Sequence, residues 1–368
     1  MSVDSIAYGP YLSPTMRNDS AGVRARLLLI LFGVSLALLM GEVAVRMHRH
    51  NPARQWGMCP LEVMSRVPQT IMGIIRPNSD KYFMGVRYRF NSQGIRGPER
   101  TPYPKPGVFR IIVVGDSVTM GHGVAEEDTY PALLEQKLNA AAMADRFEVI
   151  NLGISNANLA SVVERLNTLG VPLHPDLIVY GFTLNDIEET DAYRRSGAGP
   201  VGVARLENFR RFRHSPFYLL RAVWPRLMSL QELLWTEPGT YAWELNDNYF
   251  DNEEAWRIFD GGLAGLANVG ARLGVCVNVL IHTHIYYLNR FHPFVPVYKK
   301  VEAAAETHGL SVTESLPYLL GHPADALKVS WLDPHPNAAG DRLLAQALYD
   351  GLLRLPDGCW QKPVPIPE

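Results

Sequence analysis

The stretch RIIVVGDSVT runs from Arg110 to Thr119 and decides the fold. Its first half is apolar without alternation, which suits a strand buried on both faces of a sheet. Three later runs share this character: FEVINLG at 147–153, DLIVYGF at 176–182 and VCVNVLI at 275–281. Helical spacing marks the segments Tyr130–Ala142, Leu159–Leu169 and Glu254–Leu273. This order predicts an α/β domain in which helices sandwich a parallel sheet.

The composition of the whole chain limits the classes of partner. With 368 residues, 47% hydrophobic and 20% charged, it has apolar material for one large globular domain plus extra segments. Its 35 basic residues are balanced by 37 acidic ones. A chain with so small a net charge does not attract a polyanion electrostatically, and we predict no nucleic-acid partner.

One apolar segment lies near the N-terminus. Leu27–Met40 reads LLLILFGVSLALLM, and Gly41–Val45 prolongs it with Glu42 as the one charge. At ~1.5 Å per residue these residues reach ~28 Å, close to the hydrocarbon thickness of a bilayer. We predict a transmembrane signal anchor at 24–46. A cleaved signal peptide and a buried core helix are the competing interpretations, but no Ala-x-Ala site follows and no polar face interrupts the segment.

The orientation of this anchor does not follow from its flanking charges, because arginines lie on both sides. The short leading segment favours an N-terminus inside the cell. We therefore expect a single-pass protein of the inner (cytoplasmic) membrane whose main domain faces the periplasmic or extracytoplasmic side.

The rest of the chain divides by composition. Residues 1–23 read as a mobile tail, 47–107 as a juxtamembrane connector, 108–356 as the main domain and 357–368 as a C-terminal tail. The last part of the connector is ordered in character. Tyr82–Phe90 alternates as a strand does, and Asn91–Gly97 (NSQGIRG) has turn chemistry, so we expect both to pack on the domain edge.

Residues 187–250 interrupt the sheet pattern and predict an insertion. Its apolar stretch at 215–235 fits a lid over a site, a membrane-facing element or a helical cap that extends the core. Trp224, Trp235 and Trp243 in it are candidates for an acceptor groove.

The strongest chemical signal is Ser117, which follows the first predicted strand in the run Gly115–Thr119. A residue at the carboxyl end of a strand projects into the crevice where open α/β sheets bind ligands. If a helix starts there, its free N–H groups face the same place. A nucleophilic hydroxyl and a helix N-cap are the two interpretations of this segment.

Two more strand ends carry residues suited to an oxyanion hole. Gly153 follows the second predicted strand and Asn185 the third. The ends of parallel strands converge on one edge, so the N–H groups of Ser117 and Gly153 and the Asn185 amide are predicted to surround one oxygen.

A base for Ser117 is found near the C-terminus, in Asp333-Pro334-His335-Pro336. We predict His335 as the general base and Asp333 as the acid that orients its imidazole. The other histidines at 282, 284 and 292 have no Asp, Glu or Cys at ligand spacing, so they predict a place on the rim of the pocket and no metal site.

The three cysteines, Cys59, Cys276 and Cys359, lie far apart and form no CxxC pair. Three free thiols and a Cys59–Cys359 disulfide are both open.

Together these blocks resemble the SGNH hydrolase superfamily, also called GDSL esterases, with its four name-giving residues at Ser117, Gly153, Asn185 and His335. The resemblance extends from about Arg110 to about Leu353. It implies a flavodoxin-like three-layer α/β/α sandwich, esterase or acyl-transfer activity and no cofactor. One departure is the acid: the family places it three residues before the histidine, where Leu332 stands here. The anchor followed by NSQGIRG also resembles bacterial envelope members.

The sequence thus predicts a membrane-anchored serine esterase that hydrolyses acyl or acetyl esters of a small molecule, a lipid or a polysaccharide. An O-acyltransferase acting on an envelope polysaccharide is the first alternative, since only the acyl acceptor differs. A catalytically silent domain that binds a glycan or a partner is the second.

Overall fold

The computed structural model describes residues 20–49, 64–65, 74–75, 77–83, 85–142, 146–155, 157–188, 217, 219, 247–285, 288, 291–330 and 333–361. Most of the predicted insertion, the Trp224, Trp235 and Trp243 groove, residues 1–19 of the predicted tail and Cys59 lie outside these residues.

The domain is built on a five-stranded sheet in which every neighbouring pair is parallel. Its strands are β5 (Phe109–Gly115), β6 (Phe147–Asn151), β7 (Leu177–Phe182), β8 (Cys276–Ile281) and β9 (Ser311–Glu314). The spatial order is β6-β5-β7-β8-β9. Numbered along the chain within this sheet, that order is 2-1-3-4-5, the flavodoxin-like arrangement, so the predicted fold class is confirmed.

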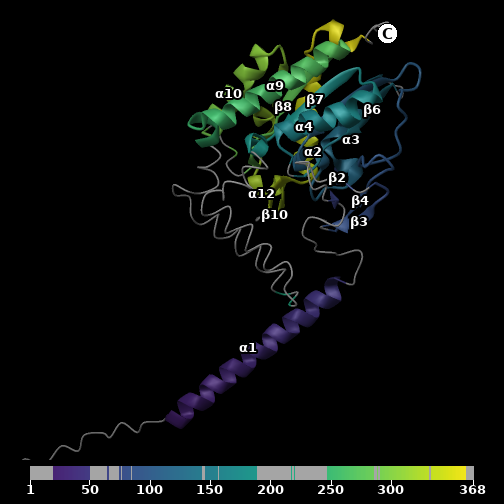
Figure 1. Ribbon diagram of the computed structural model, residues 1–368. Helices are drawn as coiled ribbons and strands as arrows, with labels where there is room; N and C mark the ends of the chain where they lie inside the picture. The colour runs from purple at the N-terminus through teal and green to yellow at the C-terminus, as the bar shows by residue number, and fades with distance from the viewer. Residues whose placement is uncertain are drawn as a thin grey trace, which may run out of the picture.

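Helices cover both faces of this sheet (Figure 1). On one face lie α3 (Tyr130–Ala142) and α13 (Ala338–Leu352), and on the other α4 (Leu159–Arg165), α9 (Glu253–Leu273) and α10 (Val295–Thr307). The apolar run of β5 does not alternate because both of its faces are buried. Ile111 and Val113 lie in one hydrophobic cluster with residues of α3 and α13, and Ile112 and Val114 lie in another with residues of α4, α9 and α10.

Shorter elements connect these layers. The helical ones are α2 (Ser117–Met120), α11 (Leu316–Leu319), α12 (Ala324–Leu327), the 3-10 turns Glu126–Asp128, Val171–Leu173, Leu184–Ile187 and Asp357–Trp360, and the π turn Leu166–Gly170 that continues α4. Two small antiparallel sheets pair β1 (Met64–Ser65) with β2 (Ile74–Ile75) and β10 (Lys328–Ser330) with β11 (Asp333–Pro336).

The end of the predicted connector is part of the domain. It forms an antiparallel hairpin of β3 (Asp80–Phe83) and β4 (Val86–Arg89), so the single strand expected at 82–90 is wrong. Tyr88, Phe90 and Ile95 are buried in the same cluster as α4 and α9. Residues ahead of the predicted boundary at 108 therefore belong to the core, and they are buried in the domain instead of packing on its edge as expected.

The cysteine pairing differs from both sequence interpretations. Cys276, at the start of β8, forms a disulfide with Cys359, and their Cα atoms are 5.4 Å apart. The C-terminal turn reaches this place because Trp360 packs against Phe109 and Phe147 at the starts of β5 and β6. The predicted C-terminal tail therefore begins as a structured turn, and Cys359 is buried.

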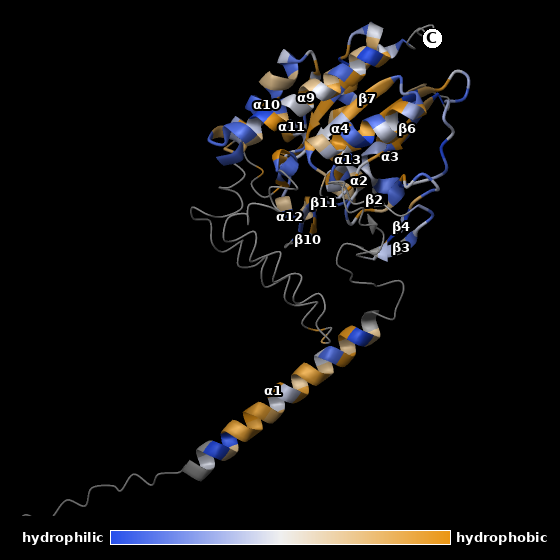
Figure 2. Ribbon diagram, viewed as in Figure 1, coloured by the Kyte–Doolittle hydropathy of each residue, from blue (hydrophilic) through white to orange (hydrophobic). Residues whose placement is uncertain are grey.

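Near the N-terminus, α1 (Ser20–Arg49) contains the stretch Arg24–Met47, which is long and apolar enough to cross a bilayer. Figure 2 shows it as a largely hydrophobic ribbon that projects away from the α/β domain. Its one internal acid, Glu42, accepts hydrogen bonds from Arg46 (2.8 Å) and from the Leu219 N–H of the insertion (2.7 Å).

Candidate active site

Ser117 is the first residue of α2, directly beyond the carboxyl end of β5. Asp116 caps this short helix, because its Oδ1 accepts the Val118 N–H at 2.9 Å. Gly115 is required before it: a Cβ there would lie 2.2 Å from Thr119 Oγ1 and 2.7 Å from the Gly181 carbonyl. Within the described part of the chain, the Ser117 N–H has no hydrogen-bond acceptor and lies at the positive end of the turn.

The structure brings Ser117, His335 and Asp333 together. Ser117 Oγ lies 2.8 Å from His335 Nε2, and His335 Nδ1 lies 2.6 Å from Asp333 Oδ1. The backbone N–H of His335 also donates to Asp333 Oδ1 at 3.0 Å. Burial raises the pKa of Asp333, but the hydrogen bonds from His122 and His335 outweigh it and hold that pKa well below its usual range. The acid is therefore an ionised acceptor.

The two-residue spacing between Asp333 and His335 follows from β11. Side chains at i and i+2 of a strand share one face, so an acid two positions ahead of the histidine lies beside it. The departure from the family's usual spacing is thus accommodated by extended backbone.

Of the other predicted oxyanion donors, Asn185 reaches the site. Its Nδ2 lies 3.4 Å from Asp116 Oδ2, and Ser117 Oγ lies 3.3 Å from the same oxygen.

Gly153 does not fit its predicted role. Its N–H already donates to Asn151 Oδ1 at 2.9 Å, and a Cβ at this position would lie 2.2 Å from the Met120 nitrogen. The glycine lets the chain after β6 pass close to α2, and its amide is occupied there. The Ser117 N–H and the Asn185 amide are the predicted donors that the geometry leaves available.

A buried carboxylic acid lies behind Asn185. The single hydroxyl proton of Thr183 faces three oxygens, those of Asp116 (2.9 Å), Asn185 (3.0 Å) and Asp186 (3.0 Å). The other oxygen of Asp186 accepts from Tyr180 Oη and the Thr183 N–H. A hydroxyl donates once, so Asp186 is best placed as a protonated acid that donates to Thr183. Burial and the nearby Asp116 raise the pKa of Asp186 well above its usual range, in agreement.

Asp186→Asn is expected to stabilise the protein relative to wild type above pH 4. The unfolded Asp186 ionises near pH 4, whereas the folded one keeps its proton, so wild-type stability falls as pH rises from there through the raised pKa. Asparagine mimics the neutral acid and removes this dependence of stability on pH. The free energy of unfolding of the variant is therefore expected to exceed that of the wild type by roughly 1 kcal/mol or more at pH 7. Melting temperatures of both proteins between pH 4 and 8 measure it. Parallel curves would contradict a buried proton on Asp186.

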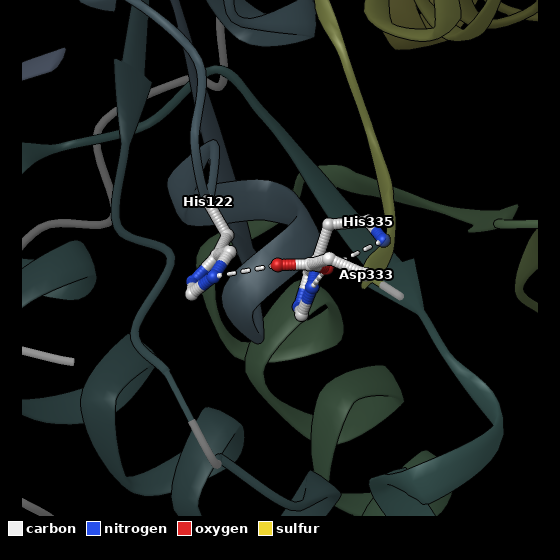
Figure 3. Close-up of side chains that lie close together, drawn as sticks. All are labelled: His122, Asp333 and His335. Atoms are coloured by element: carbon white, nitrogen blue, oxygen red, sulfur yellow. Dashed lines mark hydrogen bonds and ion pairs between the residues drawn. The ribbon is translucent and has the colours of Figure 1, made fainter. Parts of the chain in front are cut away.

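His122 is a site residue that the sequence interpretation missed. It lies between Gly121 (φ 81°) and Gly123 (φ 74°), and its Nε2 is 3.3 Å from Asp333 Oδ2 (Figure 3). Its ring stacks on that of His335 with centroids 4.1 Å apart. The Gly-His-Gly run directly after the nucleophile segment was the available signal.

Histidine and carboxylate atoms are the donors that a metal would use. Those of His122, Asp333 and His335 lie within 4.8 Å of one another. Each oxygen of Asp333 already faces one imidazole, so hydrogen bonds account for this cluster. Of the other histidines, His282 and His292 are buried and do not line a pocket rim, whereas His284 is half-buried. His282 packs edge-on against Tyr130, and burial lowers its pKa to about 3, while His292 contacts the His284 carbonyl at 2.7 Å.

The loop that carries His122 is held by residues of the segment that the sequence predicted to be a connector. Buried Arg96 donates to the carbonyls of Met120 (2.6 Å), Gly121 (2.8 Å) and Val124 (2.6 Å). Its guanidinium lies 4.1 Å from the centre of the Tyr88 ring, whose hydroxyl bonds the Gly121 carbonyl and the Gly123 N–H. The turn predicted at 91–97 thus supports the site directly.

Comparison with known proteins adds likenesses in fold. No protein-family model matches the chain, and no curated protein matches it. Among solved structures, it is similar to LAE5, an alpha/beta hydrolase enzyme from the metagenome of Lake Arreo, Spain (18% identity, TM-score 0.42, 69% of this chain and 97% of that one). It is also similar to Axe2, an acetylxylan esterase from Geobacillus stearothermophilus (16%, 0.42, 68% and 96%).

A third similar structure is a member of the lipolytic protein G-D-S-L family from Veillonella parvula DSM 2008 (17%, TM-score 0.39, 67% of this chain and all of that one). These identities are low, and the chemistry of the site rests on its own geometry. The chain is thus similar in fold to an alpha/beta hydrolase enzyme, an acetylxylan esterase and a member of the lipolytic G-D-S-L family.

Proposed function

We propose that this protein is a serine esterase that hydrolyses carboxylic esters, with Ser117 as nucleophile, His335 as base and Asp333 as the orienting acid. The observation that carries the proposal is the continuous relay from Ser117 Oγ to His335 Nε2 (2.8 Å) and from His335 Nδ1 to Asp333 (2.6 Å). A domain that only bound a glycan or a partner would need none of these contacts.

In the proposed reaction, His335 Nε2 takes the hydroxyl proton while Ser117 Oγ bonds to the ester carbonyl carbon. The carbonyl oxygen becomes an oxyanion, which the Ser117 N–H and the Asn185 amide stabilise. The tetrahedral centre then expels the alcohol, which receives the proton from His335. Water then gives a proton to His335 Nε2 while its oxygen bonds to the acyl carbon. This second tetrahedral centre breaks its bond to Ser117 Oγ, which takes the proton back from His335, and the carboxylic acid leaves.

We further propose that α1 anchors the enzyme in the inner membrane with the domain outside the cytoplasm. Two observations support this placement: the apolar stretch Arg24–Met47, and the Cys276–Cys359 disulfide, a bond typical of oxidising compartments. An ester on a lipid or an envelope polysaccharide would then lie within reach of the site.

The full chain in detergent, offered p-nitrophenyl acetate and then longer acyl esters, tests the activity. We expect turnover and covalent labelling of Ser117 by a fluorophosphonate, both lost in Ser117→Ala. An oligosaccharide with free hydroxyls is then added as an acyl acceptor. If acyl transfer to it is faster than hydrolysis by water, the result favours the transferase alternative. Neither turnover nor labelling would leave the silent binding domain as the surviving interpretation.

A further inference from the structure

His122 adds a second imidazole to the carboxylate that orients the proposed base. An ionised carboxylate can only accept hydrogen bonds, so both rings donate to Asp333: His335 through Nδ1–H to Oδ1 (2.6 Å), and His122 through Nε2–H to Oδ2 (3.3 Å). This assignment leaves His335 Nε2 without a proton, as the acceptor that Ser117 requires. When His122 is neutral, the same contact makes it the Nε2–H tautomer.

The stacked rings limit how much positive charge the site can hold. With centroids 4.1 Å apart and planes 26° from parallel, two imidazolium rings here would repel strongly across one shared carboxylate. His335 becomes an imidazolium in the proposed reaction, so His122 has to stay neutral then. Burial and the neighbouring His335 lower the pKa of His122, which acts in the same direction.

His122 is also held by contacts outside the reacting atoms. Its backbone N–H donates to the Ser117 carbonyl at 3.0 Å, and Arg96 and Tyr88 fix the residues on either side. In the described part of the chain, charged and titratable groups near its ring include Asp333 and His335 on β11, Asp116 before α2, and Arg96 behind the Gly121 carbonyl. Asp333 lies 3.3 Å from Nε2, as an acceptor for the ring.

We propose that His122 is a positioning residue: by donating to the free oxygen of Asp333, and by lying neutral against the ring of His335, it sets the strength with which the base holds its second proton. This inference rests on the proposed esterase function. It assigns to the Gly-His-Gly loop a role in the pH dependence of the reaction, distinct from substrate contact.

Two substitutions separate the hydrogen bond from the ring. His122→Phe keeps an aromatic ring against His335 but donates nothing, whereas His122→Gln places an amide N–H near the position of Nε2. Without the donor, Asp333 pulls more strongly on the His335 proton, so in His122→Phe the acid limb of the kcat/KM profile is expected to move about one unit toward higher pH. Its kcat/KM at pH 6 falls roughly tenfold. His122→Gln keeps kcat/KM within about threefold of wild type and an acid limb near the wild-type position.

The matched controls are His174→Phe and His174→Gln, at an exposed histidine that precedes the amino-terminal end of β7, whereas the site lies at the carboxyl ends of the strands. Both are expected to keep the wild-type profile. A profile of His122→Phe that matches His174→Phe would overturn the inference, and so would an equal shift in His122→Gln. Failure of the wild-type enzyme to hydrolyse any ester or to be labelled at Ser117 would instead reject the proposed function.

Discussion

Ser117→Ala is expected to lower kcat for a p-nitrophenyl ester by on the order of 10⁴- to 10⁶-fold, the largest effect of any single substitution in this chain. The hydroxyl 2.8 Å from His335 Nε2 is the proposed attacking atom, and it lies just beyond the end of β5. His335→Ala is expected to lose a similar factor, because an unassisted serine is a weak nucleophile.

The combined variants give the sharper result. When two residues act in one step, removing both costs about as much as removing either. Ser117→Ala with His335→Ala is therefore expected to match the single variants, measured as kcat against the background reaction in buffer. Asp333→Ala is expected to lose roughly 10²- to 10⁴-fold. Near-normal rates in Asp333→Ala would leave a Ser-His pair and remove the acid from the assignment.

Arg96→Met is expected to lower the free energy of unfolding by about 3–5 kcal/mol, the largest loss of stability that we predict. The guanidinium is buried and donates to three carbonyls of the loop that follows Ser117. Methionine removes all three of these hydrogen bonds, and of the three carbonyls that of Gly121 keeps the Tyr88 hydroxyl as a donor. Denaturant unfolding of the full chain, followed by tryptophan fluorescence, measures the change. Fluorophosphonate labelling of Ser117 is expected to slow as well, because the loop carries His122.

Arg87→Met is the matched control. Arg87 lies on the neighbouring strand β4, but its side chain is exposed and pairs with the exposed Asp80. Its removal is expected to leave the unfolding midpoint and the labelling rate as in wild type, since surface ion pairs contribute little. Equal midpoints for both variants would contradict the structural role assigned to Arg96.

The strands that the sequence predicted are those whose apolar runs are buried on both faces. β5 to β8 need no alternation because helices cover the two sides, and their runs were long enough to stand out. The edge strand β9 was missed because SVTE is short, three of its four residues are polar, and most of its side chains are only half-buried. The β3–β4 hairpin was missed for a local reason: Gly85 (φ 78°) turns the chain inside a stretch that alternates like one strand.

The sequence predicts those site residues whose position depends on a single nearby element. Ser117 and Asn185 follow β5 and β7, and His335 stands in a distinctive Pro-flanked run. Gly153 also follows a strand, but the direction of its N–H depends on Asn151. The contact of His122 with Asp333 joins positions 211 residues apart, and Cys276 meets Cys359 across 83. Such pairings come from the packing of whole layers, which the spacing of residues in a short window does not encode.

The contact between Ser117 and His335 joins residues 218 positions apart, and this has a consequence for the newly made protein. During synthesis from the N-terminus, the hairpin and Arg96 emerge first, and the loop that they clamp follows within 30 residues. The proposed base, His335, lies on β11 and is made only after all five strands of the sheet. A chain that stops or is cleaved before that point carries the proposed nucleophile without the proposed base. The order of these segments along the chain would thus delay the proposed hydrolysis until the domain is nearly complete.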